Sequence, residues 1–221
     1  MRVAVYYAPS PTDPLWSAAA SWLGRDAETA ATMPQPKIPG IEALTADPRL
    51  YGFHATLKPP MHLATSYDLF IEDVARLAAS LHAFALPPLA VADISGFLAL
   101  RETEPSQALQ ALADACVQNL DAHRAPPDEA ELARRRKNGL PAAQEAMLVR
   151  WGYPHVLETW FFHMTLTRRL NPEDRTILQP AAEAHFAKAL PIARTVDALT
   201  VFTQAAPGAP FLVAERFALS V

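Results

Sequence analysis

Glycine is scarce in this chain, and its few copies are widely spread. The seven glycines stand at positions 24, 40, 52, 96, 139, 152 and 208 of the 221 residues. Motifs that cradle phosphate with clustered glycines, G-x-G-x-x-G and G-x-x-x-x-G-K-[ST], therefore cannot occur, and neither can the nucleophile motif G-x-S-x-G. If the protein binds phosphate, its side chains must supply the contacts.

Cysteine, long apolar runs and a basic surplus are also lacking. A single cysteine, Cys116, excludes an internal disulfide framework and a cysteine-rich zinc module. The longest apolar region, 81–100, is interrupted by a histidine, two prolines and an aspartate, so it falls short of the ~18 residues of a spanning helix. Residues 1–9 do not have the pattern of a signal peptide. We expect a cytoplasmic protein that does not enter a membrane, and a monomer.

The balance of charge narrows the class of partner. Nineteen Lys and Arg against 23 Asp and Glu give a net charge of −4, which offers no general basic surface for DNA. The histidines show no metal-ligand spacing such as H-E-x-x-H, so we expect neither a metal nor another cofactor. A small phosphorylated substrate remains compatible with this composition, and RNA ends remain a further option.

The chain is rich enough in apolar residues, at 51%, to fold around a core as one domain spanning residues 1–221. β-Branched and aromatic runs predict strands, and apolar residues at helical spacing after capping residues predict helices. The expected strands are 2–7, 49–58, 89–94, 97–101, 159–169, 195–204 and 211–219, and the expected helices are 15–23, 66–83, 106–123 and 171–190.

The same order of strands and helices occurs twice, which indicates an internal duplication. We expect a first lobe over residues 1–95 and a second over 96–221, with a helical insertion at about 124–152. The pattern F-H-x-T-L occurs once in each lobe, around His54 and His163. A single H-x-T is a weak signal, whereas two copies with the same flanking residues favour a functional role.

Strand geometry gives this pattern its chemical meaning. Because side chains alternate along a strand, His54, Thr56 and Lys58 are expected on one face of the first motif strand. By the same alternation, His163, Thr165 and Thr167 are expected on one face of the second motif strand. If the copies pair about a pseudo-twofold axis, the two polar faces line a single cleft.

Two facing histidines suit the cleavage of a phosphodiester without a metal. One neutral imidazole takes a proton from water, and the other, protonated, donates a proton to the leaving oxygen. The hydroxyls of Thr56 and Thr165 are then positioned to bind phosphate oxygens. Lys58 and Thr167, which follow them on the same faces, are further candidates for binding the phosphate. The residues do not tell which histidine is the acid and which is the base.

Other residues near the motifs are weaker candidates. Arg169 falls on the same strand face as His163, so it reaches the phosphate if the strand extends that far. Tyr6 and Phe161 are candidates for stacking against a substrate, although core packing is the commoner role of such aromatics. The basic run 134–137 in the insertion either faces solvent or attracts a phosphorylated substrate. Gly52, two residues before His54, is expected to leave room for the ligand.

The two motif strands, 51–60 (YGFHATLKPP) and 162–167 (FHMTLT), resemble those of the two-histidine (2H) phosphoesterase superfamily. More narrowly, these segments together with residues 6–9 (YYAP) and 22–26 (WLGRD) resemble its subgroup of phosphonate metabolism proteins. The resemblance spans nearly the whole chain. It implies an α+β, pseudo-twofold bilobal fold, with two antiparallel sheets lining a concave cleft and helices outside.

The resemblance also implies an activity. It assigns catalysis to His54 and His163 and phosphate binding to Thr56 and Thr165. The implied reaction is metal-independent hydrolysis of a cyclic or 2′-linked phosphodiester, with a cyclic ribose phosphate of phosphonate breakdown as one substrate. Two alternatives share the same cleft. They are a module that binds a phosphorylated nucleotide or an RNA end without turnover, and an RNA 2′-5′ ligase-like enzyme.

Overall fold

A seven-stranded antiparallel sheet forms the centre of the molecule, in the strand order β4-β5-β6-β2-β1-β8-β9. The structure, a computed structural model, describes residues 1–137 and 139–221. The strands of this sheet are β1 (Arg2–Tyr7), β2 (Ala55–Met61), β4 (Leu89–Ile94), β5 (Phe97–Glu102), β6 (Met164–Thr165), β8 (Ala198–Gln204) and β9 (Leu212–Ala218). A separate pair joins β3 (Phe84–Leu86) to β7 (Arg194–Val196).

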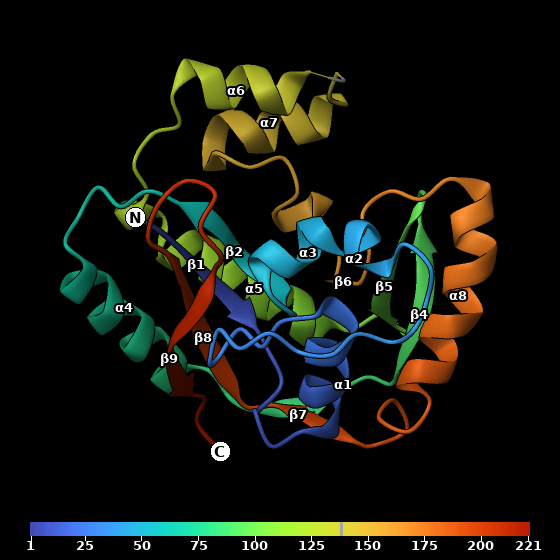
Figure 1. The fold of residues 1–221 in the computed structure, drawn as a ribbon. Coiled ribbons are helices and arrows are strands. Elements are labelled where there is room, and N and C mark those ends of the chain that lie inside the picture. Colours follow the sequence, from blue (N-terminus) through green and yellow to red (C-terminus); the bar gives the residue numbers. More distant parts are fainter. Residues whose placement is uncertain (138) are drawn as a thin grey trace.

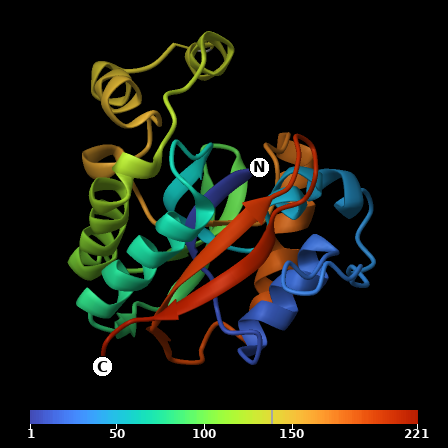
Figure 2. The ribbon, with the colours of Figure 1, turned by 90° about the vertical axis from the view of Figure 1, so that its left-hand side faces the viewer.

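Helices cover the outside of the sheet, which confirms the expected α+β class. In the turned view, α4 (Tyr67–Ser80) and α5 (Gln107–Asn119) lie on one side, and α1 (Pro14–Leu23) and α8 (Pro172–Phe186) lie on the other (Figure 2). The remaining helical segments are α2 (Ile41–Leu44), α3 (Ala46–Tyr51), α6 (Glu129–Arg136), α7 (Ala142–Trp151) and the short 3₁₀ turns Asp121–His123 and Leu157–Thr159. In the described residues, no helix is both long and apolar enough to cross a membrane.

The main helices begin at residues that the sequence marks as caps. The side chain of Asp13 accepts from the backbone N–H of Leu15 at the start of α1, and that of Asn171 accepts from Asp174 at the start of α8. Such caps satisfy amide groups that have no partner within the helix. Residues 124–152 contain two short helices, α6 and α7, which stand above the sheet (Figure 1).

The sheet has two halves that meet at a single residue pair, Ala55 with Met164. One half contains β9, β8, β1 and β2, and the other contains β6, β5 and β4. These halves of the sheet do not coincide with the predicted lobes 1–95 and 96–221. The strands β8 and β9 come from the second lobe but lie beside β1 of the first, and β4 comes from the first lobe but lies beside β5 of the second. The duplication itself remains a prediction.

Two strand predictions were wrong in their extent. Residues 46–51, expected partly as strand, form α3, and β2 begins only at Ala55 and then runs through Pro59 and Pro60 to Met61. The register between β1 and β2 shifts twice, so β2 is bulged and its prolines are accommodated there. The strand expected over 159–169 is reduced to Met164 and Thr165.

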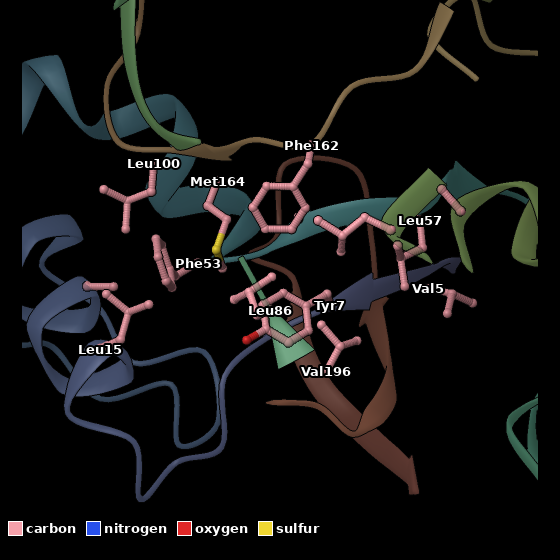
Figure 3. Packing of buried hydrophobic residues seen from close by; sticks show 14 of the residues in the cluster. Val5, Tyr7, Leu15, Phe53, Leu57, Leu86, Leu100, Phe162, Met164 and Val196 are labelled. Carbon is pink, nitrogen blue, oxygen red and sulfur yellow. The ribbon is translucent and has the colours of Figure 1, made fainter. Parts of the chain in front are cut away.

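The apolar face of each motif strand packs into the core, as the alternation predicts. Phe53 and Leu57 of the first motif and Phe162 and Met164 of the second are at most 3% exposed. Figure 3 shows Phe53, Met164 and Phe162 converging on one another, with Tyr7 and Leu100 nearby. This packing holds the two motif strands side by side and leaves their polar faces for the opposite side of the sheet.

Candidate active site

One cavity of about 450 Å³ brings the two motifs together. His54, Thr56, His163 and Thr165 all line it, and Thr167 lies with them. Its other lining residues are Arg2, Tyr6, Asp47, Pro48, Tyr51, Gly52, Pro60, Arg134, Arg135 and Tyr153. The predicted shared cleft is therefore present, and it is built from residues of five separate stretches of the chain.

The two imidazoles are held by equivalent hydrogen bonds. Nδ1 of His54 lies 2.9 Å from the carbonyl oxygen of Gly52, and Nδ1 of His163 lies 3.1 Å from that of Phe161. Each carbonyl belongs to the residue two positions earlier, and it accepts the Nδ1 proton. In the neutral ring this leaves Nε2 as the proton acceptor, which is the arrangement that general base catalysis requires.

The backbone conformation at Gly52 requires a glycine. Its φ of +79° lies in the left-handed region, and an added Cβ would stand 2.7 Å from Cβ of Ala27. Only glycine accepts this conformation without strain. The chain turn that aims the Gly52 carbonyl at His54 therefore depends on the glycine. Gly52 also lines the cavity, and that it leaves room for a ligand stays a prediction.

An aromatic ring stacks on each histidine. The ring centroids of Tyr6 and His54 are 3.7 Å apart at an interplanar angle of 18°, and those of Phe161 and His163 are 4.6 Å apart at 28°. The guanidinium of Arg101 also lies over Phe161, at 5.5 Å. The structure thus places Tyr6 and Phe161 against the imidazoles, where they fix the orientation of the rings, and not as free surfaces for stacking a substrate.

Burial makes both histidines less basic than usual. It lowers the pKa of His54 to about 4, against the opposing hydrogen bond to Gly52, and the charge on His163 lowers the pKa further. Burial also lowers the pKa of His163, with smaller contributions from His155 and Arg101. The two rings therefore differ in environment, and the larger shift falls on His54.

The threonines of the two motifs have different contacts. The hydroxyl of Thr56 lies 3.2 Å from Nε2 of His54, whereas Thr165 lines the cavity beside β5. Thr167 is buried, and its hydroxyl accepts from the backbone N–H of Leu98 at 3.0 Å. Thr167 lines the cavity, but its hydroxyl oxygen already accepts a hydrogen bond from Leu98 of the adjoining strand β5.

Lys58 does not reach the cavity, which corrects its assignment as a phosphate ligand. Its ammonium group donates to the carbonyl of Val117 at 3.0 Å and to Asp121 at 3.3 Å, and the residue is 2% exposed. The bulge in β2 is the cause. Thr56 pairs with Tyr6 but Lys58 pairs with Val5, so Lys58 lies on the core face of the sheet. Burial lowers its pKa to about 8.

Arg169 also lies outside the main cavity. Its guanidinium donates to the carbonyl of Ser95 at 2.6 Å, and it lines a neighbouring cavity of about 360 Å³. That cavity shares Thr56, Tyr153 and His163 with the first. The strand β6 ends at Thr165, so the alternation does not extend to Arg169, but Arg169 and His163 line this neighbouring cavity together. Phosphate binding by Arg169 stays a prediction.

Several lining residues carry no signal that sequence reasoning could use. Arg2, Asp47 and Tyr153 lie outside both motif strands and stand in no motif of their own. The basic run in the insertion gave a partial signal, because Arg134 and Arg135 line the cavity. Among the described residues, no group of three or more His, Cys, Asp or Glu is arranged to hold a metal ion.

Fold and site together define an α+β protein with a duplicated histidine-threonine motif in one cavity. The sequence profile of the family described as protein of unknown function DUF1045 matches residues 56–212, and the chain belongs to this family.

Two relatives, both named ribose 1,5-bisphosphate phosphokinase PhnN, are longer proteins. The one from Janthinobacterium sp. (strain Marseille) is 40% identical over 230 residues, covering 99% of this chain and 51% of the relative. The one from Laribacter hongkongensis (strain HLHK9) is 37% identical over 217 residues, covering 96% and 50%. The chain thus spans about half the length of these relatives. Among solved structures, E. coli LigT complexed with NADP+ is 15% identical with a TM-score of 0.47, covering 100% of this chain and 98% of LigT.

Proposed function

We propose that this protein hydrolyses a cyclic phosphodiester by paired histidine catalysis, without a metal. The observation that carries the proposal is the equivalent placement of His54 and His163 in one cavity, each with Nδ1 bonded to a backbone carbonyl. Such a pair supplies both proton transfers that the cleavage of a phosphodiester needs. The threonine hydroxyls beside them supply donors for phosphoryl oxygens.

The pKa values of the two histidines assign the general base to one and the general acid to the other. His54, whose pKa burial lowers to about 4, is neutral over most of the pH range and acts as the base. Its Nε2 takes a proton from the water molecule that attacks phosphorus. His163 gives its Nε2 proton to the ring oxygen as the P–O bond breaks. The products are a phosphate monoester and a free hydroxyl group. His54 then releases its proton to solvent and His163 takes one up, so both imidazoles return to their starting protonation states.

Tyr6 adds a third donor in this scheme. Its hydroxyl is buried in the cavity wall and has no hydrogen-bond partner among the described residues. Burial raises the pKa of Tyr6 well above its usual value, so the group stays protonated and donates. A phosphoryl oxygen would satisfy this otherwise costly buried hydroxyl.

The relatives support ribose as the substrate scaffold. Half of each relative matches this chain, and both are named for a kinase that acts on a phosphorylated ribose. Opening a cyclic phosphate on ribose leaves a ribose phosphate monoester, which is the kind of compound in that name. We therefore infer that the substrate is a cyclic ribose phosphate.

The test is turnover of D-ribose 1,2-cyclic phosphate and of adenosine 2′,3′-cyclic phosphate, followed by phosphorus NMR in excess EDTA. The proposal expects a new monoester resonance in the presence of chelator. Saturable binding without any product would instead indicate a binding module. Joining of an RNA with a 2′,3′-cyclic phosphate end to a 5′-hydroxyl RNA, with no hydrolysis, would indicate a ligase. Either result would overturn the proposed hydrolase.

A further inference from the structure

The strands that carry the two histidine motifs have little backbone pairing between them. In the described part of the chain, the ladder between β2 and β6 consists of one residue pair, Ala55 with Met164. The pairing does not continue to Thr56 and His163, which line the cavity. The distance between the imidazoles of His54 and His163 therefore depends on contacts outside the ladder.

The indole of Trp160 supplies a second link between the two motifs. Its Nε1 donates to the backbone carbonyl of Thr56 at 2.8 Å, the length of a well-formed hydrogen bond. Trp160 packs against the main core and lines the neighbouring cavity of about 360 Å³ together with Thr56 and His163. The bond thus joins the segment that leads into the second motif to the first motif strand, directly beside the site.

Each end of this bond adjoins a group that contacts a histidine. The hydroxyl of Thr56 lies 3.2 Å from Nε2 of His54. Trp160 directly precedes Phe161, whose carbonyl accepts the Nδ1 proton of His163 and whose ring stacks on that imidazole. A shift of Trp160 would therefore displace the Phe161 carbonyl and ring, and His163 with them.

The turn that leads into Trp160 is firmly held. Leu157 has a φ of +50°, a left-handed conformation that leucine rarely adopts and that persists only where the surroundings enforce it. Gln110 of α5 donates to the carbonyl of Leu157 at 3.0 Å, and the hydroxyl of Thr159 lies 2.7 Å from the carbonyl oxygen of Pro154. The backbone N–H of Trp160 then donates to the carbonyl of Leu157 at 2.9 Å. The indole therefore extends toward β2 from a fixed support.

We propose that Trp160 is a positioning residue whose indole N–H sets the separation and orientation of the two imidazoles through the carbonyl of Thr56. This inference rests on the proposed function and adds to it a residue that acts through Thr56 and Phe161. Both proton transfers need an imidazole at the right distance from the phosphodiester, and a misplacement of about 1 Å can cost about 10²-fold in rate. Loss of the indole bond should therefore lower kcat and leave substrate binding nearly unchanged.

The experiment removes the indole donor in two ways. Trp160→Phe keeps an aromatic ring, and substitution of Trp160 by benzothienylalanine keeps the shape of the indole with sulfur in place of the N–H. Trp22→Phe is the matched control, because Nε1 of Trp22 donates to the carbonyl of Leu166 at 3.1 Å and Trp22 lines neither cavity that contains His163. The readouts are kcat and KM on D-ribose 1,2-cyclic phosphate, the NMR signals of the His54 and His163 rings, and urea unfolding.

Both substitutions at Trp160 should lower kcat about 10–100-fold and change KM by less than about twofold, because alignment is lost while binding is retained. The ring signals of His163 should shift or broaden, since its orientation is no longer fixed. Trp22→Phe should lower the midpoint of urea unfolding at least as much as Trp160→Phe does, because its indole is fully buried. It should nevertheless leave kcat and the histidine signals unchanged.

The outcomes separate this inference from the proposed function. If the wild-type protein hydrolyses the probe and both Trp160 variants keep its kcat, the positioning role is refuted and the hydrolase stands. An equal loss of kcat in Trp22→Phe would also refute it, because general loosening of the second motif would then explain the effect. If the wild-type protein hydrolyses nothing, the proposed function fails. The ring signals of His163 still decide the inference in that case, and unchanged signals in both Trp160 variants would refute it.

Discussion

The two histidine motifs are alike where their side chains meet the backbone and differ in what surrounds them. Nδ1 of His54 and Nδ1 of His163 both bond to the carbonyl two residues earlier, and an aromatic ring stacks on each imidazole. The first ring is a tyrosine with a buried hydroxyl, and the second is a phenylalanine. Local sequence thus repeats the orientation of the histidines, while long-range packing makes their environments unequal.

Removing either imidazole gives the largest expected effect and tests whether both copies are needed. His54→Ala and His163→Ala should each lower kcat on a cyclic phosphate by about 10²–10⁴-fold, because each loses one of the two proton transfers. The rates are measured by phosphorus NMR in EDTA. His82→Ala is the control, since His82 is exposed and lies outside the cavity. Full activity in either cavity variant would show that the copies are not a catalytic pair.

The threonines should contribute less, and unequally. Thr56→Ala and Thr165→Ala each remove a donor to phosphate, at about 1.5–3 kcal/mol or roughly 10–100-fold in kcat/KM. Thr56→Ala should have the larger effect, because its hydroxyl also contacts Nε2 of His54. Steady-state kinetics of both variants, with the Thr→Ser changes as controls, measure the difference. A loss confined to Thr165 would reverse the proposed asymmetry.

The pH profile reports on the difference between the two imidazoles. Hydrolysis needs His54 neutral, hence a pH above its pKa of about 4, and His163 protonated, hence a pH below its own pKa, which lies under 6.5. The profile of kcat/KM should be bell-shaped with an acidic optimum, and the rate should fall about tenfold per pH unit on either side. A rate that keeps rising above pH 7 would contradict the assigned proton donor.

Tyr6→Phe makes the first copy resemble the second at the stacking position. The ring stacking on His54 is retained, and only the buried hydroxyl is lost. We expect kcat/KM to fall about 2–12-fold, the equivalent of one hydrogen bond of about 0.5–1.5 kcal/mol. Steady-state kinetics measure the change, and circular dichroism checks the fold. An unchanged kcat/KM would mean that the Tyr6 hydroxyl does not touch the substrate.

The smallest expected effect on activity is at Lys58, where the two copies diverge. Lys58→Met should change kcat/KM by less than about twofold, because the ammonium group lies on the core face. The free energy of unfolding should instead fall by about 1–3 kcal/mol, since Asp121 and the Val117 carbonyl lose a buried donor. Urea unfolding measures this loss. A large drop in activity with unchanged stability would return Lys58 to the active site.

Sequence reasoning recovered the elements whose signals are local. The caps at Asp13 and Asn171 placed α1 and α8, and the repeated F-H-x-T-L placed both histidines and their threonines in the cavity wall. It overestimated the strands around both motifs. The bulge in β2 shows why: the register of a strand, and whether it tolerates prolines, depend on the strand that pairs with it. The alternation of residues within one strand does not contain that information.

The amino-acid sequence by itself determined which side chains could carry phosphodiester chemistry, because alternation and capping involve residues close together in the chain. Only the tertiary structure decided which of them share the cavity. Pairing between β1 and β2 turned Lys58 into the core and stacked Tyr6 on His54, and the insertion brought Arg134 and Arg135 to the same cavity as Arg2. The physical reason is that these contacts join segments far apart in the chain, where strand register and packing set the direction of each side chain.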